Sequence, residues 1–368
     1  MNRKTTTMKD RPALRVLLLL IPVTILALLI IFGAFYTYWN AASPEKTCAS
    51  CHEIGKSVNT FARSAHRGLK CSECHGTALS NGFHSIKEKG NMIVTHMTNE
   101  YIEDVRLNHD QVMTVMADCK RCHEDEYADW SSGGHSALYH DIFLDRKHNE
   151  AEQLNSDCLR CHGMFSDVPV EKLVEPLDIT GPWAFKIQDI ADKPVIPCQA
   201  CHQTHIKGLP GSNPDYSDPV NIFYSRKDSS EMVSFYYRPD RRSIPASYLP
   251  KLTITDGEKK VNVSDDIVMR LCIQCHSPNA RHEAGSSDDR TPTGVHEGLS
   301  CTACHEGHSN DAAKSCGKCH PAISNCNLDV TEMNTSFTDP ASQNNIHTVS
   351  CNDCHKDQNF KRILTVIK

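Results

Sequence analysis

The chain lacks a basic domain. Its 368 residues carry a formal net charge of −6 at pH 7, and its clearest cluster of positive charge lies in the first fifteen residues, where five basic side chains accompany one acidic side chain. A protein that binds nucleic acid needs a basic face to neutralise phosphates. The sequence therefore gives no reason to expect nucleic acid as a partner.

Long apolar runs are scarce beyond residue 40, so an ordinary aliphatic core is hard to build from this sequence. Cysteine and histidine are abundant instead, with 19 and 21 residues. Cysteine forms roughly 5% of the chain, below the ~8–10% of small disulfide scaffolds and above what a reducing cytosol tolerates without metal or cofactor chemistry. The cysteines are therefore expected to have a role other than forming disulfides with one another.

One long apolar run lies near the N-terminus. Val16 to Phe35 is uncharged and is followed by Tyr36, Tyr38 and Trp39. A helix of about twenty residues spans the hydrocarbon core of a bilayer. With the basic cluster before it, the run predicts a single-pass anchor in the cell inner membrane, with a cytoplasmic N-terminus and the rest of the chain in the periplasm. A cleaved secretory signal is the alternative, although its apolar region normally covers only ~7–15 residues.

The decisive pattern is Cys-x-x-Cys-His, the attachment signature of c-type haem. It occurs nine times and uses eighteen of the nineteen cysteines, whereas chance would give about 0.06 copies. The predicted covalent attachment sites are Cys48, Cys51, Cys71, Cys74, Cys119, Cys122, Cys158, Cys161, Cys198, Cys201, Cys272, Cys275, Cys301, Cys304, Cys316, Cys319, Cys351 and Cys354. The predicted proximal iron ligands are His52, His75, His123, His162, His202, His276, His305, His320 and His355.

The spacing of the motif explains this assignment. Two thiols on one turn add across the two vinyl groups of a haem, and the next imidazole is then held under the iron. A zinc site also uses paired cysteines, but it closes with four ligands and does not require a histidine after every second cysteine. A redox dithiol would account for one copy and not for nine. The sequence therefore predicts nine c-type haems as cofactors.

Twelve histidines outside the motifs can supply sixth ligands to nine irons. The distal candidates are His66, His96, His109, His135, His140, His148, His205, His282, His296, His308 and His347, with His84 as the twelfth. His66, His296 and His347 come four or five residues before a motif, and His205, His282 and His308 follow a proximal histidine closely enough to turn toward a neighbouring haem. A surface or propionate-bonding histidine is the alternative for each.

Bis-histidine ligation favours low reduction potentials. Met97, Met113, Met116 and Met164 are competing axial ligands, with ordinary packing as the alternative. Cys326 lies outside every motif and is predicted to be an inert buried thiol, with intermolecular pairing as the alternative.

The predicted fold is mainly α with extensive irregular loops wrapped around a haem core, one N-terminal transmembrane helix and a small β insert near 216–265. Apolar periodicity predicts a helix over Asn99 to Met116. Asp256-Gly257 between two apolar segments predicts a β-hairpin. Five segments follow from the motif spacing: leader and anchor at 1–40, a two-haem unit at 41–117, a three-haem unit at 118–205, a haem-free insert at 206–271 and a four-haem unit at 272–368. The insert either has a plain structural role, covers a haem edge or docks a partner.

The N-terminal part resembles the NapC/NirT family of membrane-anchored multihaem quinol dehydrogenases. The resemblance rests on the anchor and on the segments CASCHE (48–53), SAHRGLKCSECHG (64–76) and FHSIKEKGNMIVTH (83–96). It implies that quinol is the electron donor and that the haem at Cys48, Cys51 and His52 is the entry point. It also implies that Lys87 or Lys89 contributes to the quinol site.

The middle part, CKRCHEDEYADWSSGGHSAL (119–138) followed by DCLRCHG (157–163), is similar to the cytochrome c554-like and octahaem cytochrome families. That similarity implies His135 as a haem ligand. The segment GVHEGLSCTACHEGH (294–308) resembles multihaem electron conduits in general.

Two function classes remain open. The first is an electron-transfer protein that takes electrons from the quinol pool or a membrane oxidoreductase and delivers them to a periplasmic or extracellular redox protein. The second is a reductase or dehydrogenase with one open haem for nitrite, hydroxylamine or a sulfur oxyanion. The Cys-x-x-Cys-Lys motif of ammonia-forming nitrite reductases is absent. The twelve histidines outside the motifs are enough to supply a sixth ligand to each of nine haem irons. These observations favour the electron-transfer protein, and no catalytic residue is predicted. A structural or filament-forming role is the third and least favoured function, because the anchor implies a fixed place in the membrane.

Overall fold

A computed structural model describes residues 12–41, 54–75, 91, 93–98, 107–144, 154–175, 183–206, 214–216, 218–221, 232–251, 253–256, 258–276 and 298–309. The chain separates into two compact units. The first comprises Met1–Val58 and Gly68–Glu103, and the second comprises Asn59–Arg67 and Asp104–Lys368.

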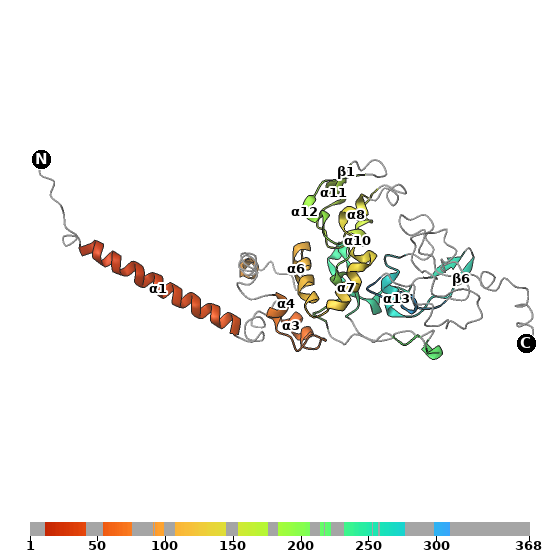
Figure 1. The fold of residues 1–368 in the computed structure, drawn as a ribbon, viewed down its shortest axis with the longest axis horizontal. Helices are drawn as coiled ribbons and strands as arrows, with labels where there is room; N and C mark the ends of the chain where they lie inside the picture. The colour runs from red at the N-terminus through yellow and green to blue at the C-terminus, as the bar shows by residue number, and fades with distance from the viewer. Residues whose placement is uncertain are drawn as a thin grey trace, which may run out of the picture. The chain divides into compact units, whose positions relative to one another are not determined.

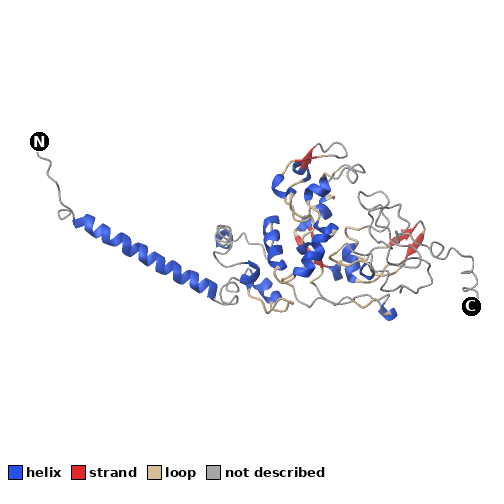
Figure 2. Cartoon of the chain, in the orientation of Figure 1, coloured by secondary structure: helices blue, strands red, loops and turns tan. Residues whose placement is uncertain are grey.

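Apart from the long helix α1, the described residues form short helices, together with a few small strands that belong to the second unit (Figures 1 and 2). The helices are α1 (Pro12–Ala41), α3 (Gly55–Phe61), α4 (Cys71–His75), α6 (His109–Lys120), α7 (Glu124–Ser132), α8 (Tyr139–Phe143), α10 (Leu159–His162), α11 (Val170–Leu173), α12 (Gln188–Ala191) and α13 (Ile267–Cys272). Single 3₁₀ turns are η3 (Gly134–Ser136), η4 (Cys198–Ala200), η5 (Pro219–Asn221), η6 (Arg238–Asp240), η7 (Ala246–Tyr248) and η8 (Cys301–Ala303). The strands are β1 (Val174–Glu175), β2 (Ala184–Phe185), β3 (Ser234–Tyr237), β4 (Arg242–Pro245), β5 (Ile254–Asp256) and β6 (Lys259–Val261).

The first unit contains α1, the long apolar helix. Its segment Leu18–Tyr38 is 21 residues long, contains no buried residue, and is long and apolar enough to cross a membrane, a property that a signal sequence shares. Pro22 lies inside the helix without ending it. Residues 91 and 93–98 are helical, and the side chains of Ile93, Val94 and Met97 there are exposed.

In the second unit, α6 leads directly into a Cys-x-x-Cys-His segment. Asn108 and Gln111 form a reciprocal capping box, in which each side chain accepts the other residue's backbone N–H at 2.9 Å. This cap explains why α6 starts at His109. Leu107 and Asn108 are not helical, so the helix predicted over Asn99 to Met116 is interrupted there, and residues 99–106 lie outside the described residues. His109, Val112 and Met116 form the buried face of α6.

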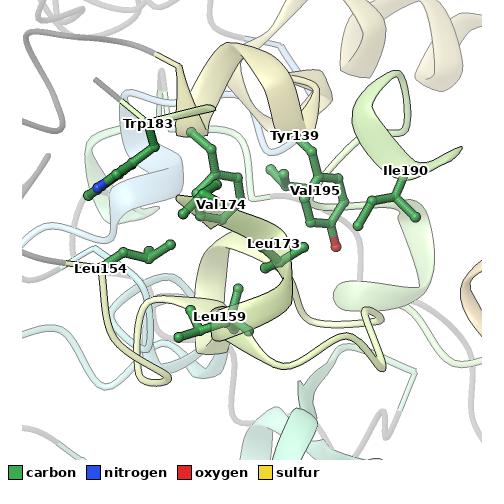
Figure 3. Packing of buried hydrophobic residues seen from close by; sticks show 10 residues of the cluster. Tyr139, Leu154, Leu159, Leu173, Val174, Trp183, Ile190 and Val195 are labelled. Atoms are coloured by element: carbon green, nitrogen blue, oxygen red, sulfur yellow. The ribbon is translucent and has the colours of Figure 1, made fainter. Parts of the chain in front are cut away.

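Two apolar clusters hold the second unit together. In the first, Tyr139 from α8, Leu159 from α10, Leu173 from α11 and Val174 from β1 pack on Val195, and each is at most 2% exposed (Figure 3). The second joins Val112 of α6 to residues of several later elements: Met164, Phe165, Ala200, Phe235, Tyr236, Ala246, Leu249 and Ile267. Both clusters are assembled from short segments that are far apart in the sequence.

The strands form three antiparallel pairs, β1 with β2, β3 with β4, and β5 with β6. In β5–β6, Ile254 pairs with Val261 and Asp256 with Lys259, which is the predicted hairpin. The β3–β4 hairpin lies in the same insert and pairs Ser234 with Pro245. The described elements therefore confirm a mainly α fold with a small β insert and an N-terminal apolar helix.

The burial of Leu173 makes a stability prediction. Its side chain is fully buried in the first cluster, whereas Leu144, just after α8, is 42% exposed. Leu173→Ala removes buried apolar contacts and leaves a cavity, so we expect it to lower the free energy of unfolding by about 2–5 kcal/mol. The measurement is urea unfolding of the detergent-solubilised protein, followed by circular dichroism. Leu144→Ala is the matched control, and equal losses in the two variants would contradict the placement of this core.

Candidate haem sites

Five Cys-x-x-Cys-His segments of the second unit close the same helical turn. In each, the N–H of the histidine donates to the carbonyl of the first cysteine at 2.8–2.9 Å, and the N–H of the second cysteine lies 3.1–3.4 Å from that carbonyl. These segments begin at Cys119, Cys158, Cys198, Cys272 and Cys301. The turn brings two thiols and one imidazole together, which is the arrangement that covalent haem attachment needs.

A sixth segment forms helix α4 in the first unit. The N–H of Lys70 donates to Glu73 Oε1 at 3.1 Å at the start of that helix. The segments that begin at Cys48, Cys316 and Cys351 lie outside the described residues.

Three motif histidines face a histidine from a distant part of the chain. The ring centres of His123 and His66 are 6.1 Å apart, and those of His276 and His135 are also 6.1 Å apart. The ring centres of His202 and His308 are 5.9 Å apart. In every pair one member follows the second cysteine of a motif and the other was a distal candidate.

The separation within these pairs fits a metal ion between the two rings. Imidazole nitrogens bind metals at about 2 Å, so two rings on opposite sides of one ion have centres about 6 Å apart. No set of three or more histidine, cysteine, aspartate or glutamate side chains converges as a closed metal-ion site in the described part of the chain. The recurring arrangement is therefore a pair of imidazoles beside two thiols, which suits the iron and the vinyl groups of haem.

The surroundings lower the pKa of three of the paired imidazoles, those of His66, His135 and His202. Desolvation lowers the pKa of His202 to about 4, with the charges of His308 and His123 acting in the same direction. Desolvation also lowers the pKa of His135 to about 4, followed by the effects of His276, His308 and His305. The pKa of His66 is lowered by burial and then by His123. Neutral imidazole is the form that binds iron, so the environment presents these rings ready for coordination.

The electrostatic effects on these pKa values also relate the three histidine pairs to one another. His123 of one pair acts on His202 of the next, and His308 of that pair acts on His135 of the third. His305, the motif histidine of the segment at Cys301, also acts on His135. The three pairs therefore lie near one another within the second unit.

Contacts also join the motif segments to one another. Arg160 Nη2 donates to Gln274 Oε1 at 3.1 Å, which joins the segment at Cys158 to the segment at Cys272. Cys161 Sγ donates to the carbonyl of Gln274 at 3.9 Å. Beside the segments at Cys272 and Cys301, Ser300 Oγ donates to Asp266 Oδ2 at 2.6 Å. Three attachment turns are therefore packed together.

The remaining described distal candidates have other surroundings. His140 has both ring nitrogens engaged, with Nδ1 3.0 Å from the carbonyl of Ala191 and Nε2 2.9 Å from Asp141 Oδ1. His96 is exposed among the helical residues 93–98. The ring of His205 lies 5.5 Å from the ring of Phe61, and its carbonyl accepts the Thr60 hydroxyl at 2.6 Å.

His109 is buried against Tyr139, with ring centres 5.5 Å apart. Desolvation lowers the pKa of His109 to about 4, Lys193 adds to this effect, and Asp110 opposes it. Met116 and Met164 are buried and Met164 belongs to the second apolar cluster, which agrees with a packing role. The candidates His148, His282, His296 and His347, with Lys87, Lys89 and Cys326, lie outside the described residues.

Sequence reasoning did not foresee the part that the β insert plays in one site. Ser234 N–H donates to the carbonyl of Cys201 at 2.9 Å, and Gln203 N–H donates to Met232 at 2.8 Å. His202 forms an isolated bridge with Val233. The insert therefore braces the turn of this motif. No local sequence signal pairs residues so far from the motif with its backbone.

Two family models match the chain. Residues 11–168 match the NapC/NirT cytochrome c family, N-terminal region, and residues 255–321 match cytochrome c3. No curated protein and no solved structure matches it. With the repeated attachment turn, these matches support a multihaem c-type cytochrome with c-type haem as its cofactor. More particularly, the chain is similar to the NapC/NirT kind, and this match begins before α1 and includes it, which supports a membrane-anchored electron-transfer protein.

Haem content follows from the attachment turns. We expect the intact mass of the purified protein to exceed that of its polypeptide by nine haem groups, since each motif supplies two thiols and one imidazole. Replacing both Cys198 and Cys201 with serine removes one haem from this count, as measured by mass spectrometry and by the pyridine haemochrome spectrum. Cys326→Ser is the control and leaves the count unchanged. A wild-type count below nine would show that some motifs are not used.

Proposed function

We propose that this chain carries nine covalently attached haems and conducts electrons from the membrane quinol pool, or from a membrane oxidoreductase, to a periplasmic or extracellular redox protein. The observation that carries the proposal is the series of imidazole pairs at 5.9–6.1 Å. When bound, haem iron supplies a one-electron couple whose potential depends on its axial ligands and surroundings.

The proposed ligand pairs are His123 with His66, His202 with His308, and His276 with His135. Each pair would supply two imidazole nitrogens to one haem iron. Such a pair leaves no position for nitrite, hydroxylamine or a sulfur oxyanion, which favours the carrier over the reductase. Two imidazoles also favour low potentials, as quinol-fed electron transfer needs.

The protein side chains provide spacing and partial cover. Ala200 and Ala303, at the variable positions of two motifs, are at most 4% exposed, so the middle of each of these turns is buried. Contacts between neighbouring motif turns, such as that of Arg160 with Gln274, hold successive sites close together. Short separations between fixed sites are what a chain of electron carriers requires.

The anchor defines where electrons enter. α1 is proposed to span the inner membrane with the N-terminus in the cytoplasm, since basic residues precede it. The five segments proposed above, 1–40, 41–117, 118–205, 206–271 and 272–368, then run from the anchor to the last haem group. By likeness to NapC/NirT proteins, quinol is oxidised near the haem at Cys48 with Lys87 or Lys89 in its pocket. Electrons leave through the haems of residues 272–355.

The ligand pairs are tested by low-temperature electron paramagnetic resonance of the oxidised protein. We expect low-spin haem throughout the wild type and no change when nitrite or hydroxylamine is added. His308→Ala opens one axial position, so one high-spin haem that responds to added ligand is expected. His66→Ala provides a second, independent pair.

His140→Ala is the matched control because both nitrogens of that ring are engaged by protein atoms. It is expected to keep every haem low-spin. A high-spin haem in the wild type that shifts on addition of nitrite would favour the reductase. A low-spin spectrum in both His308→Ala and His66→Ala would reject the proposed pairs.

Quinol oxidation is tested by the rate at which menaquinol reduces the protein in detergent. Removal of residues 1–40, or substitution of Lys87 and Lys89 by alanine, is expected to slow this reduction at least tenfold, while reduction by dithionite stays complete. Lys251→Ala, which removes an exposed lysine from the insert, is the control. Equal menaquinol rates in all variants would exclude direct quinol oxidation and leave a membrane oxidoreductase as donor.

A further inference from the structure

Asp266 is a carboxylate buried between two haem-attachment turns. It is 0% exposed and stands six residues before Cys272. One oxygen, Oδ1, accepts the N–H of Val268 at 3.1 Å and so caps α13, the helix that ends at Cys272. The other oxygen, Oδ2, accepts the hydroxyl of Ser300 at 2.6 Å. Ser300 immediately precedes Cys301, so one carboxylate holds the starts of two motifs.

The hydrogen bonds continue beyond this pair. Ser300 Oγ lies 3.0 Å from Thr302 Oγ1, which lies 2.9 Å from the hydroxyl of Tyr216. Ser300 and Tyr216 are at most 4% exposed. The network therefore runs from α13 through the turn at Cys301 to the β insert, and it is closed to solvent over most of its length.

The carboxylate of Asp266 lies beside both attachment turns. It caps the helix that ends at Cys272, and it accepts a hydrogen bond from Ser300, the residue before Cys301. An ionised carboxylate at this position would act through a buried, weakly screened environment.

Helix capping alone does not explain why a buried aspartate occupies position 266. A serine or asparagine caps a helix as well as an aspartate does, and the cap uses only Oδ1. The neighbouring Asp265 shows the ordinary arrangement, because its carboxylate is 55% exposed and pairs with Lys251. The second oxygen of Asp266 and the burial of its carboxylate therefore require another account.

We propose that Asp266 positions and tunes the haems attached at Cys272 and Cys275 and at Cys301 and Cys304. Through Ser300 it sets the separation of the two attachment turns. Its negative charge lowers both reduction potentials, because a ferric haem that accepts one electron loses one positive charge and with it the attraction to the carboxylate. This inference rests on the proposed haem-carrying function and assigns two sites to the low-potential part of the series.

The test is an optical redox titration of the full-length protein. Asp266→Asn keeps the shape and the cap but removes the charge. We expect an upward shift in potential confined to two of the nine haem equivalents. Asp265→Asn removes an exposed charge next to it and is expected to leave the titration unchanged.

Ser300→Ala separates charge from structure. It breaks the hydrogen bond to Oδ2 and keeps the carboxylate, so the potentials are expected to stay low. Unchanged potentials in Asp266→Asn, or equal upward shifts in Asp266→Asn and Ser300→Ala, would overturn the tuning role. Haem mass and low-spin spectra of each variant are recorded alongside. If the wild type carries haem at these two motifs but Asp266→Asn leaves the potentials unchanged, the role of Asp266 is rejected and the proposed function is not. If the wild type lacks haem at these motifs, the proposed function is rejected.

Discussion

One hydrogen bond recurs in the five attachment segments of the second unit, from the N–H of the motif histidine to the carbonyl of the first cysteine. It closes a single helical turn, so the two thiols and the imidazole keep the same relative positions in each copy. Everything else in the described part of this unit is arranged around these turns. α6 leads into one, α13 leads into another, and the β3–β4 hairpin braces a third.

The protein around the turns is built from short elements because little of its core is aliphatic. Two modest clusters, around Leu173 and around Phe235, are held together by residues from many segments. The paired imidazoles have separations of 5.9–6.1 Å, which match metal coordination from both sides. We infer that flat, apolar haem groups complete the interior that the side chains alone leave small.

Buried polar groups have a particular place in such an interior. Asp266, Ser300 and Tyr216 form a network whose members come from three separate segments, and its hydrogen bond between Asp266 and Ser300 is buried. In these surroundings a single charge acts strongly on its neighbours. The β insert thereby contributes in two ways, since it braces the turn at Cys198 and completes this network.

The sequence alone determined the local chemistry of the sites. The Cys-x-x-Cys-His spacing is contained within one turn, the anchor is a continuous run, and the hairpin at residues 254–261 has its own turn residues, so each could be predicted without knowing the fold. The start of α6 was misjudged because apolar periodicity does not reveal the cap at Asn108. Only the tertiary structure decided that His66 faces His123, that His308 faces His202 and that Asp266 meets Ser300. These contacts join residues that are 34 to 106 positions apart in the sequence. They arise from the packing of short elements against one another, so a local sequence pattern cannot predict them.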